Sequence, residues 1–532
     1  MDSQPITTFS LRMAASAFSR LMPHLFPGDG DEHGAILSVG MARSGDHVRL
    51  LVRDVFLARD GIDYVPSRFG YRALSGDFIA RVSDHCCRER LGYLAVHCHG
   101  GRDSVAFSDV DLASHKRGYP ALLDITDGGP VGALVFAESA VAGEIWIREG
   151  VFPLEGLTVV GANHRRLYQS PRKAPTAVEE MFHRQSLIFG AAGQAILRNA
   201  TVGIIGLGGV GSLVSEWLSH LGVGRIIAVD FDRIDPSNRS RVVGSTRWDA
   251  RELLRNSRWA WARRLGERSA AYKVDVAKRV ARRANPDIVY EAIVGDVVDG
   301  VVANRLKEAD FLFLCADSAQ SRLVFNALVH QYLIPGVQVG SKVPVDRQSG
   351  EVGDIFVVSR PVIPHSGGGC LRCNGLISPA RLQEEALSIA ERDRQRYVDD
   401  PQVHAPSVIT LNALAAGQAV NDFAMGFLGL QENAAPGYLM HYVRERRWVP
   451  TMCQADGGCL HCGASPNSIY ARGDRAELPC RERVTPTTGA QDVVDRGRAA
   501  PSSPVIHVPQ GVRNEQGPRS NGVSSRGRPV GQ

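Results

Sequence analysis

The sequence predicts an α/β chain with two folded domains, joined by a polar linker at 166–178 and followed by a disordered tail. Residues 1–165 alternate short apolar runs with turn residues, which is typical of an α+β domain with few helices. Residues 179–463 alternate strand-like and helix-like patterns, which predicts a Rossmann-like, mostly parallel sheet covered by helices. Residues 464–532 are rich in Pro, Gly, Ser and Arg, and such a segment buries too little apolar surface to offset its ordering entropy.

The composition excludes several classes of protein. At about 150 residues per domain, 532 residues correspond to two to four domains. We found no apolar run near the roughly 18 residues that a membrane span needs, and no basic, then apolar N-terminal leader. The net charge of +5 is dilute over this length and does not favour a nucleic-acid partner. We therefore expect a cytoplasmic protein without membrane or nucleic-acid partners.

The first chemical cluster combines two histidines with two carboxylates. His97 and His99 end a predicted strand, and a period of two puts both side chains on one face. Ser108 and Asp111 follow after eight residues and share a face at the start of a helix or turn. Two imidazoles and one carboxylate leave the fourth zinc position to water, and Glu32 is placed to take its proton. Taken singly, the histidines are as well explained as surface residues, and Ser108 as a helix cap.

In combination, Glu32, the His-x-His pair and Ser-x-x-Asp resemble the JAMM signature of the JAB/MPN metallopeptidases. The resemblance implies that His97, His99 and Asp111 hold a catalytic zinc. It also implies that Glu32 is the general base and that Ser108 stabilises the oxyanion. Gly100 stands where that family usually has proline. Members of the family cleave ubiquitin-like proteins from lysine or from a fusion junction.

A glycine-rich turn marks the second cluster. A strand leads into it and a helix leads out, so that backbone N–H groups at the helix start can meet phosphate oxygens. An acidic residue, about 20 residues on, suits a ribose hydroxyl. This pattern alone fits a nicotinamide oxidoreductase equally well. The residues are Gly206, Gly208, Gly209, Gly211 and Asp230.

Charged residues further along favour a triphosphate over a dinucleotide. Asn238 and Arg241 follow Asp232 closely, and Lys273 precedes a predicted helix that ends at 284–286. Cations that converge on a glycine-rich loop supply the charge compensation that a triphosphate needs. Asp317 follows a buried strand, and its carboxylate is a suitable Mg²⁺ ligand.

In their order, these elements resemble the ThiF/MoeB and ubiquitin-activating-enzyme superfamily, whose members adenylate the C-terminal glycine of a ubiquitin-like protein. The resemblance implies ATP and Mg²⁺ as cofactors and a homodimer in which Arg184 acts on the neighbouring subunit's nucleotide. Arg322 and Asn326 match the same series, but they are as well explained as helix braces. Asp232 is either part of the D-x-D element or a turn cap. The implied ligands of the nucleotide are Asp230, Asp232, Asn238, Arg241, Lys273 and Asp317. The segment 244–271, rich in Trp and Arg, departs from the family pattern.

Two C-x-x-C pairs, Cys370/Cys373 and Cys459/Cys462, predict a closed four-thiolate zinc site, and the alternative is a redox pair. The segment between the pairs contains no cysteine before Cys453, so a catalytic thioester has weak support. Cys480 falls in the predicted tail. We expect Cys86, Cys87 and Cys315 to be core residues.

These observations predict a bifunctional enzyme that adenylates a ubiquitin-like protein and cleaves its fusions or conjugates with zinc. Such pairings resemble bacterial ubiquitin-like conjugation systems, in which a separate conjugating enzyme receives the product. Two alternatives stay open. The chain could process and activate a sulfur carrier for cofactor or cysteine biosynthesis. One half could instead be silent and bind the partner only.

Overall fold

The computed structural model describes residues 6, 8–65, 72–173, 178–345, 349–386, 406–432 and 437–481. One compact unit spans Met1–Arg483 and contains both predicted domains. Within the described part of the chain, no helix combines the length and hydrophobicity needed to cross a membrane.

The N-terminal part is an eight-stranded sheet in the order β1-β3-β2-β4-β5-β6-β7-β8, with an additional pairing of β1 with β7. This extra pairing joins β1, at one end of the sheet, to β7, the strand next to the other end, so the strands curve into a barrel around their apolar side chains. The strands are β1 (Thr8–Ala14), β2 (Gly34–Ser44), β3 (His47–Leu57), β4 (Gly92–Cys98), β5 (Val131–Phe136), β6 (Val141–Ile147), β7 (Gly150–Val160) and β8 (Arg165–Leu167).

Three helices accompany this sheet: α1 (Ala15–Leu25), α2 (Gly76–Glu89) and α3 (Asp109–Ile125). Helix α3 begins where the sequence predicts it, because Ser108 and Asp111 form a reciprocal capping box. The predicted domain end at residue 165 is two residues short, since β8 continues the sheet to the buried Leu167.

The second sheet has the order β11-β10-β9-β12-β13-β14-β15-β16. Its first five strands are parallel and the last three pairings are antiparallel, as expected for a mostly parallel sheet. The strand order reverses between β9 and β12, which makes the carboxyl ends of these strands the expected place for a ligand. The strands are β9 (Thr201–Ile205), β10 (Arg225–Val229), β11 (Val289–Ile293), β12 (Phe311–Leu314), β13 (Gly336–Lys342), β14 (Phe356–Val362), β15 (Tyr438–Tyr442) and β16 (Arg447–Thr451).

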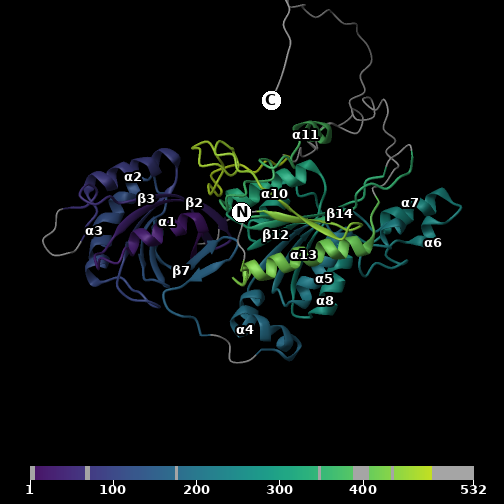
Figure 1. The fold of residues 1–532 in the computed structure, drawn as a ribbon, viewed down its shortest axis with the longest axis horizontal. Helices are drawn as coiled ribbons and strands as arrows, with labels where there is room; N and C mark the ends of the chain where they lie inside the picture. Colours follow the sequence, from purple (N-terminus) through teal and green to yellow (C-terminus); the bar gives the residue numbers. More distant parts are fainter. Residues whose placement is uncertain are drawn as a thin grey trace, which may run out of the picture. The chain divides into compact units, whose positions relative to one another are not determined.

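Helices cover both faces of this sheet. Figure 1 shows α5, α8 and α13 on one side of β12 and β14 and α10 on the other. The buried apolar residues form one cluster for each side. The helices are α4 (His183–Arg198), α5 (Gly209–His220), α6 (Glu252–Arg255), α7 (Ala260–Ser269), α8 (Lys273–Ala284), α9 (Gly300–Leu306), α10 (Ala319–Gln331), α11 (Pro379–Ala386) and α13 (Ile409–Phe427), with short 3-10 turns at Glu180–Phe182 and Pro236–Asn238.

The prediction of a disordered tail from residue 464 is wrong for residues 464–481. Tyr470 and Ala471 are fully buried in the same cluster as Ala42 and Leu51 of the first sheet. The guanidinium of Arg53 donates hydrogen bonds to the Ser465, Pro466, Ser468 and Tyr470 carbonyls. Residues 482–532 of the predicted tail lie outside the described residues.

Replacing Arg53 with alanine is expected to lower the free energy of unfolding by about 2–4 kcal/mol, because the carbonyls of the buried Ser468 and Tyr470 lose a charged donor. Thermal unfolding followed by circular dichroism measures the loss. Arg20→Ala is the control, since Arg20 is exposed on α1. Equal melting temperatures for the two variants would mean that residues 464–481 do not stabilise the fold.

Candidate functional site

The glycine-rich turn lies at the carboxyl end of β9, where the strand order reverses. Gly206 has φ 89°, a left-handed conformation that favours glycine. A Cβ on Gly211 would lie 1.9 Å from the Gly206 carbonyl oxygen. The start of α5 therefore packs so closely on the turn that no residue with a side chain fits at position 211. The position of a Cβ on Gly208 is open space, which leaves this side of the turn accessible to a ligand.

Asp230 follows β10 and is buried beside this turn. Its carboxylate accepts hydrogen bonds from the backbone N–H of Leu207 at 2.7 Å and of Asp232 at 2.8 Å. Burial raises the pKa of the Asp230 carboxyl, although nearby Lys273 and the two amides act in the opposite direction. The carboxylate thus holds the two loops together and retains lone pairs for a hydroxyl donor.

The predicted cation cluster is present on the same edge. Lys273 begins α8 and pairs with Asp232, with 2.6 Å between Nζ and the Oδ2 oxygen. Arg241 contacts the glycine turn, since its Cδ lies 3.4 Å from where a Cβ of Gly209 would be. Asn238 is buried and caps its own turn, where its Oδ1 accepts from the Asp235 N–H. The Lys273 ammonium is therefore balanced by the Asp232 carboxylate.

Of the other two residues predicted for the nucleotide site, Asp317 lies near the glycine turn, whereas Arg184 is exposed on α4. Asp317 is exposed shortly beyond the end of β12 at Leu314. The backbone N of its neighbour Ala316 would lie 3.0 Å from a Cβ on Gly206, so Asp317 shares the edge with the turn. Arg184 is exposed near the start of α4, and the described residues include no hydrogen bond or ion-pair partner for its side chain. Its neighbour Gln185 instead donates to Gln194 and to the Leu221 carbonyl.

Asn412 is a member of this site that the sequence did not indicate. It lies in α13, is 2% exposed, and its Nδ2 would be 2.2 Å from a Cβ on Gly209. Its side chain also bonds Ser341 and Ser407. The only signal was an asparagine in a mainly apolar helix pattern, and this does not point to a loop about 200 residues earlier.

Arg322 and Asn326, left open as ligands or braces, brace the segment that carries the first C-x-x-C pair. Asn326 Oδ1 accepts from the Leu371 N–H at 2.9 Å, and Arg322 donates to the Leu376 carbonyl at 3.2 Å. Both side chains therefore have structural partners away from the glycine turn.

The histidine cluster is assembled by β4 and the first turn of α3. The Nε2 atoms of His97 and His99 are 3.2 Å apart, and they lie 3.6 Å and 3.4 Å from Asp111 Oδ2. One ligand atom from each residue lies within 4.8 Å of the other two, close enough to share one ion. His99 Nδ1 is 3.1 Å from the Ala106 carbonyl, a contact that leaves its Nε2 lone pair for a metal.

Asp111 has two functions in this arrangement. Its Oδ2 accepts from the Ser108 hydroxyl at 2.7 Å and from the Ser108 N–H at 2.8 Å, so the residue caps α3. Burial acts to raise the pKa of the Asp111 carboxyl, but hydrogen bonds from His97 and Ser108 outweigh it and keep that pKa below its usual range. The carboxylate is therefore ionised at neutral pH, as a metal ligand must be.

Glu32 faces the same cluster from the loop before β2. Its Oε1 is 3.8 Å from His99 Nε2, and both residues line a surface pocket of about 470 Å³ with Ser108 and Asp111. Arg72 holds this loop, since it donates to Asp31 at 2.5 Å and to Asp60 at 2.6 Å. Glu32 is thus positioned beside the cluster without being part of it.

The four cysteines of the two C-x-x-C pairs converge. The Sγ–Sγ distances are 3.6 Å for Cys370–Cys373, 3.7 Å for Cys370–Cys459 and 3.6 Å for Cys373–Cys462. Four thiolates around a tetrahedral zinc, with bonds of about 2.3 Å, would be about 3.8 Å apart. The spacing suits a metal, whereas a disulfide needs about 2.05 Å.

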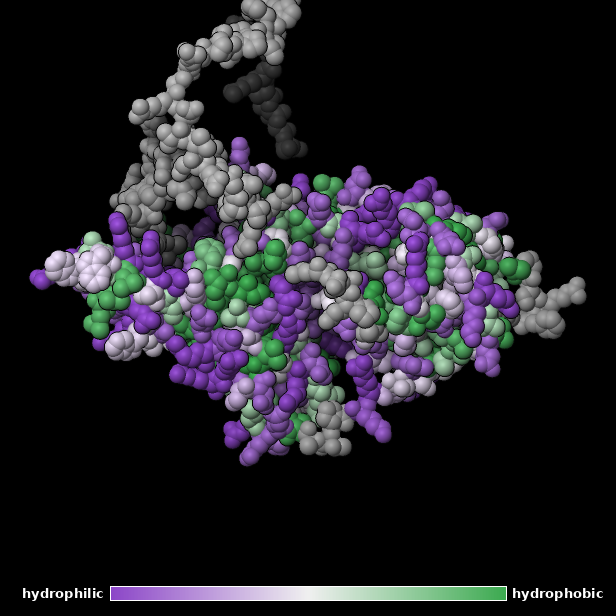
Figure 2. Space-filling model, turned by 180° about the vertical axis from the view of Figure 1, so that it is seen from behind, coloured by the Kyte–Doolittle hydropathy of each residue, from purple (hydrophilic) through white to green (hydrophobic). Residues whose placement is uncertain are grey.

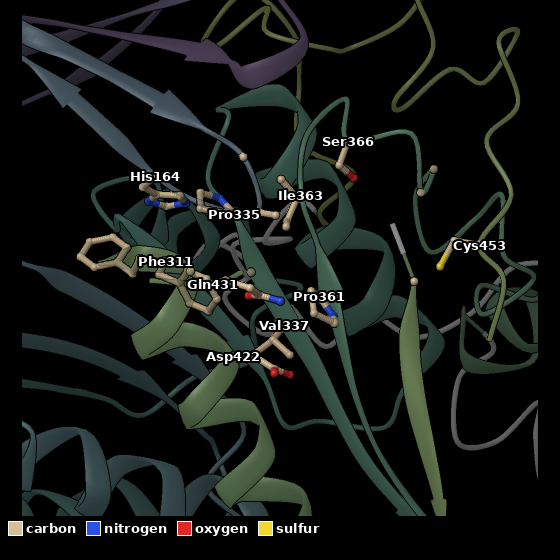
Figure 3. Close-up of a pocket in the computed structure, with 18 residues that line it drawn as sticks. His164, Phe311, Pro335, Val337, Pro361, Ile363, Ser366, Asp422, Gln431 and Cys453 are labelled. Atoms are coloured by element: carbon tan, nitrogen blue, oxygen red, sulfur yellow. The ribbon is translucent and has the colours of Figure 1, made fainter. Parts of the chain in front are cut away.

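The remaining cysteines give little support to a thioester. Cys453 lines a cavity of about 70 Å³ between β13, β14 and α13, and Figure 3 shows its sulfur on the opposite side of the view from His164. Burial raises the pKa of the Cys453 thiol, which disfavours the nucleophilic thiolate. Cys480, predicted in the tail, is half-buried in the fold, and Cys87 is exposed, which corrects its assignment to the core.

The part of the chain that contains the glycine turn is similar to known proteins. The ThiF family model matches residues 182–460. The chain is 30% identical over 199 residues to the adenylyltransferase and sulfurtransferase uba4 of Emericella nidulans, a match that covers 36% of each protein. It is 25% identical over 284 residues to the molybdopterin-synthase adenylyltransferase of Escherichia coli K12, covering 53% of this chain and 95% of that protein. A crystal structure of E. coli MccB with ATP has a TM-score of 0.39 at 20% identity, over 53% of this chain and 75% of that one.

Proposed function

Because the chain belongs to the ThiF family, we propose that it uses ATP to adenylate the C-terminal glycine of a ubiquitin-like or sulfur-carrier protein. Its uba4 and molybdopterin-synthase relatives are named as adenylyltransferases, and the proposal extends that activity to this chain. The observation that carries it is the meeting of the glycine turn with Lys273, Arg241 and Asp230 at the point where the strand order of the second sheet reverses.

The residues fit a nucleotide in a consistent way. The Asp230 carboxylate accepts the ribose hydroxyls, and the N–H groups at the start of α5 face the phosphates. Arg241 and Lys273 neutralise phosphate charge, and the Asn238 amide donates a hydrogen bond to a phosphate oxygen. Asp317 would hold Mg²⁺, which would supply further charge neutralisation. Carboxylate attack on the α-phosphorus then depends mainly on positioning. In a homodimer, Arg184 would reach the neighbouring subunit's nucleotide, which explains its exposure in a single chain.

ATP–pyrophosphate exchange tests this activity directly. The probe is a ubiquitin-like protein with an intact C-terminal glycine, and the same protein without that glycine is the matched control. Exchange with the intact protein and none with the shortened one is expected. Exchange that is absent with both, or equal with both, would contradict the assignment.

The adenylated partner could react in two ways, by conjugation to a target or by conversion to a thiocarboxylate. Residues 374–452 contain no cysteine, and the raised pKa of the Cys453 thiol disfavours a thioester there. The adenylate would therefore pass to a separate conjugating enzyme or to a sulfur donor. Mass spectrometry of the partner after reaction separates the outcomes, since a thiocarboxylate differs from an isopeptide linkage.

We also propose that the N-terminal domain is a JAMM-type zinc peptidase that acts on the same protein terminus. The proposal rests on the triangle of His97, His99 and Asp111, which offers three ligands and leaves a fourth position open toward a pocket. Zinc at this position would supply a water of low pKa. Glu32 would accept the proton from that water. The Ser108 hydroxyl, which donates to Asp111 in this structure, would turn its one proton from Asp111 to the oxyanion.

Replacing Glu32 with glutamine is expected to reduce cleavage of a ubiquitin-like fusion by about 10²–10⁴-fold, because a general base is lost. Zinc content, measured by mass spectrometry, should not change, since Glu32 is not a ligand. Glu155→Gln is the control, because Glu155 is an exposed glutamate of the same domain. Full cleavage by Glu32→Gln would remove it as the base.

A second candidate for this domain is a silent module that binds the partner without cleaving it. Gly100, in place of the usual proline beside His99, is the residue that favours this reading. Zinc bound at the triangle together with partner binding but no cleavage of any fusion would establish it.

A further inference from the structure

The segment 244–271 forms a helical hairpin with small residues inside and large ones outside. Ala262 and Gly266, one turn apart on α7, are buried against α6. A Cβ on Gly266 would lie 3.0 Å from Leu254 Cβ and from Arg255 Cγ, so the two helices touch nearly backbone to backbone. The large apolar side chains of the segment therefore have no place between the helices.

These side chains point outward instead. Trp261 and Leu265 share one face of α7 and are 66% and 49% exposed. A helix that served only its own fold would bury such residues, and exposed apolar groups at this density mark an interaction site. We call this the Trp–Leu surface; it consists of Trp248, Leu253, Trp259, Trp261 and Leu265, of which the first three are 66%, 75% and 54% exposed.

Ion pairs connect the hairpin to the nucleotide-binding edge. Arg279 of α8 makes two hydrogen bonds to Asp249, at 2.9 and 2.8 Å. Arg255 bonds Asp235, which caps the turn that contains Asn238, at 2.6 Å. The Trp–Leu surface is therefore attached to the element that contributes Asn238 and Arg241 to the nucleotide site.

The same surface is basic. The segment contains seven arginines against three acidic residues. Two of the acids, Asp249 and Glu252, are neutralised by Arg279 and Arg239. By contrast, no described residue forms an ion pair with the exposed side chains of Arg247, Arg258, Arg264 or Arg268. Figure 2 shows pale and green residues beside purple ones at the end of the molecule formed by α6 and α7.

The charge of the Trp–Leu surface distinguishes among its candidate binding partners. A second copy of the hairpin would bring two basic surfaces together, and residues 484–532, with six arginines against three acids, are also basic. The complementary partner is acidic. A protein fits better than a nucleic acid, because Leu253 and Leu265 offer aliphatic contact rather than stacking, and Trp and Arg dominate protein–protein hot spots.

We propose that the Trp–Leu surface binds an acidic face of the ubiquitin-like or sulfur-carrier protein and holds it beside the nucleotide site. This rests on the proposed function, because the partner is the substrate of adenylation. The hairpin supplies affinity for the partner and takes no part in the chemistry, so its loss changes the KM for the partner and leaves kcat unchanged.

The test uses the full chain, the ubiquitin-like protein that supports ATP–pyrophosphate exchange above and two double variants. Trp261→Ala/Leu265→Ala removes the apolar anchors, and Arg264→Glu/Arg268→Glu reverses the charge. The matched controls are Trp448→Ala/Leu439→Ala, which removes an exposed pair from β15 and β16, and Arg282→Glu/Arg283→Glu, which reverses two exposed arginines on α8. Calorimetry gives Kd, and ATP–pyrophosphate exchange gives kcat and both KM values.

Each surface variant is expected to raise Kd and KM for the partner about tenfold or more, with kcat and the KM for ATP unchanged. The controls should match the unmodified chain. Unchanged Kd in both surface variants, or no binding by the unmodified chain, would overturn the proposal. Binding that is lost in the variants, without any exchange by the unmodified chain, would support the surface and refute the adenylation. Surface-dependent binding of a 20-nucleotide RNA, without binding of the protein, would assign the surface to nucleic acid.

Discussion

Replacing Lys273 with alanine is expected to lower partner-dependent ATP–pyrophosphate exchange by about 10²–10³-fold. Its ammonium is largely shielded from solvent, and the only carboxylate it pairs with is Asp232, 2.6 Å away, among the described residues. A triphosphate brings several negative charges to this position, where low local dielectric strengthens each contact. The loss should appear in kcat as well as in the KM for ATP, because charge on the leaving pyrophosphate grows in the transition state.

Lys278→Ala is the matched control, since it removes a lysine from the same helix about one and a half turns further on. Circular dichroism should give the same melting temperature for both variants within about 2 °C, because a half-exposed ion pair stabilises a fold by less than about 1 kcal/mol. Exchange within threefold of the unmodified chain in Lys273→Ala would remove this residue from the nucleotide site.

Local patterns were sufficient to predict the parts of the sites that lie on one strand and its following turn. The two-residue period puts His97, in β4, and His99, just after its end, on the same face, and the observed 3.2 Å between their Nε2 atoms follows from that spacing. The glycine turn was equally predictable, because Gly206 needs a positive φ and Gly211 tolerates no side chain. In both cases neighbours in sequence dictate the geometry.

Contacts between distant segments could not be predicted in this way. Asn412 reaches Gly209 only because α13 packs across the sheet, and no local pattern records that packing. Similarly, composition averaged over residues 464–532 hid the short stretch around Tyr470, which is buried against the first sheet. The sequence showed that the segment 244–271 departs from the family pattern. It did not show that the small residues of this segment are buried and the large apolar ones exposed, which only the structure gives.

Replacing Cys370 with serine is expected to remove one zinc per chain and to destabilise the second domain severely. Cys370 is buried, and its sulfur lies 3.6 Å and 3.7 Å from the sulfurs of Cys373 and Cys459. Zinc bound to four thiolates contributes about 10–16 kcal/mol in small zinc-binding peptides, more than the total stability of most domains. The site also joins residues 370–373 to residues 459–462, from which the chain continues directly to the buried Tyr470.

His97→Ala is the informative comparison, because it should remove the other zinc while leaving the melting temperature nearly unchanged. Mass spectrometry of the native chain should therefore find two zinc ions, and one in each variant. Thermal unfolding should separate them, with a large loss of melting temperature only for Cys370→Ser. Cys87→Ser, which changes an exposed cysteine, should retain both ions and full stability. A Cys370→Ser chain that keeps its zinc and its melting temperature would mean that the four cysteines do not form a structural metal site.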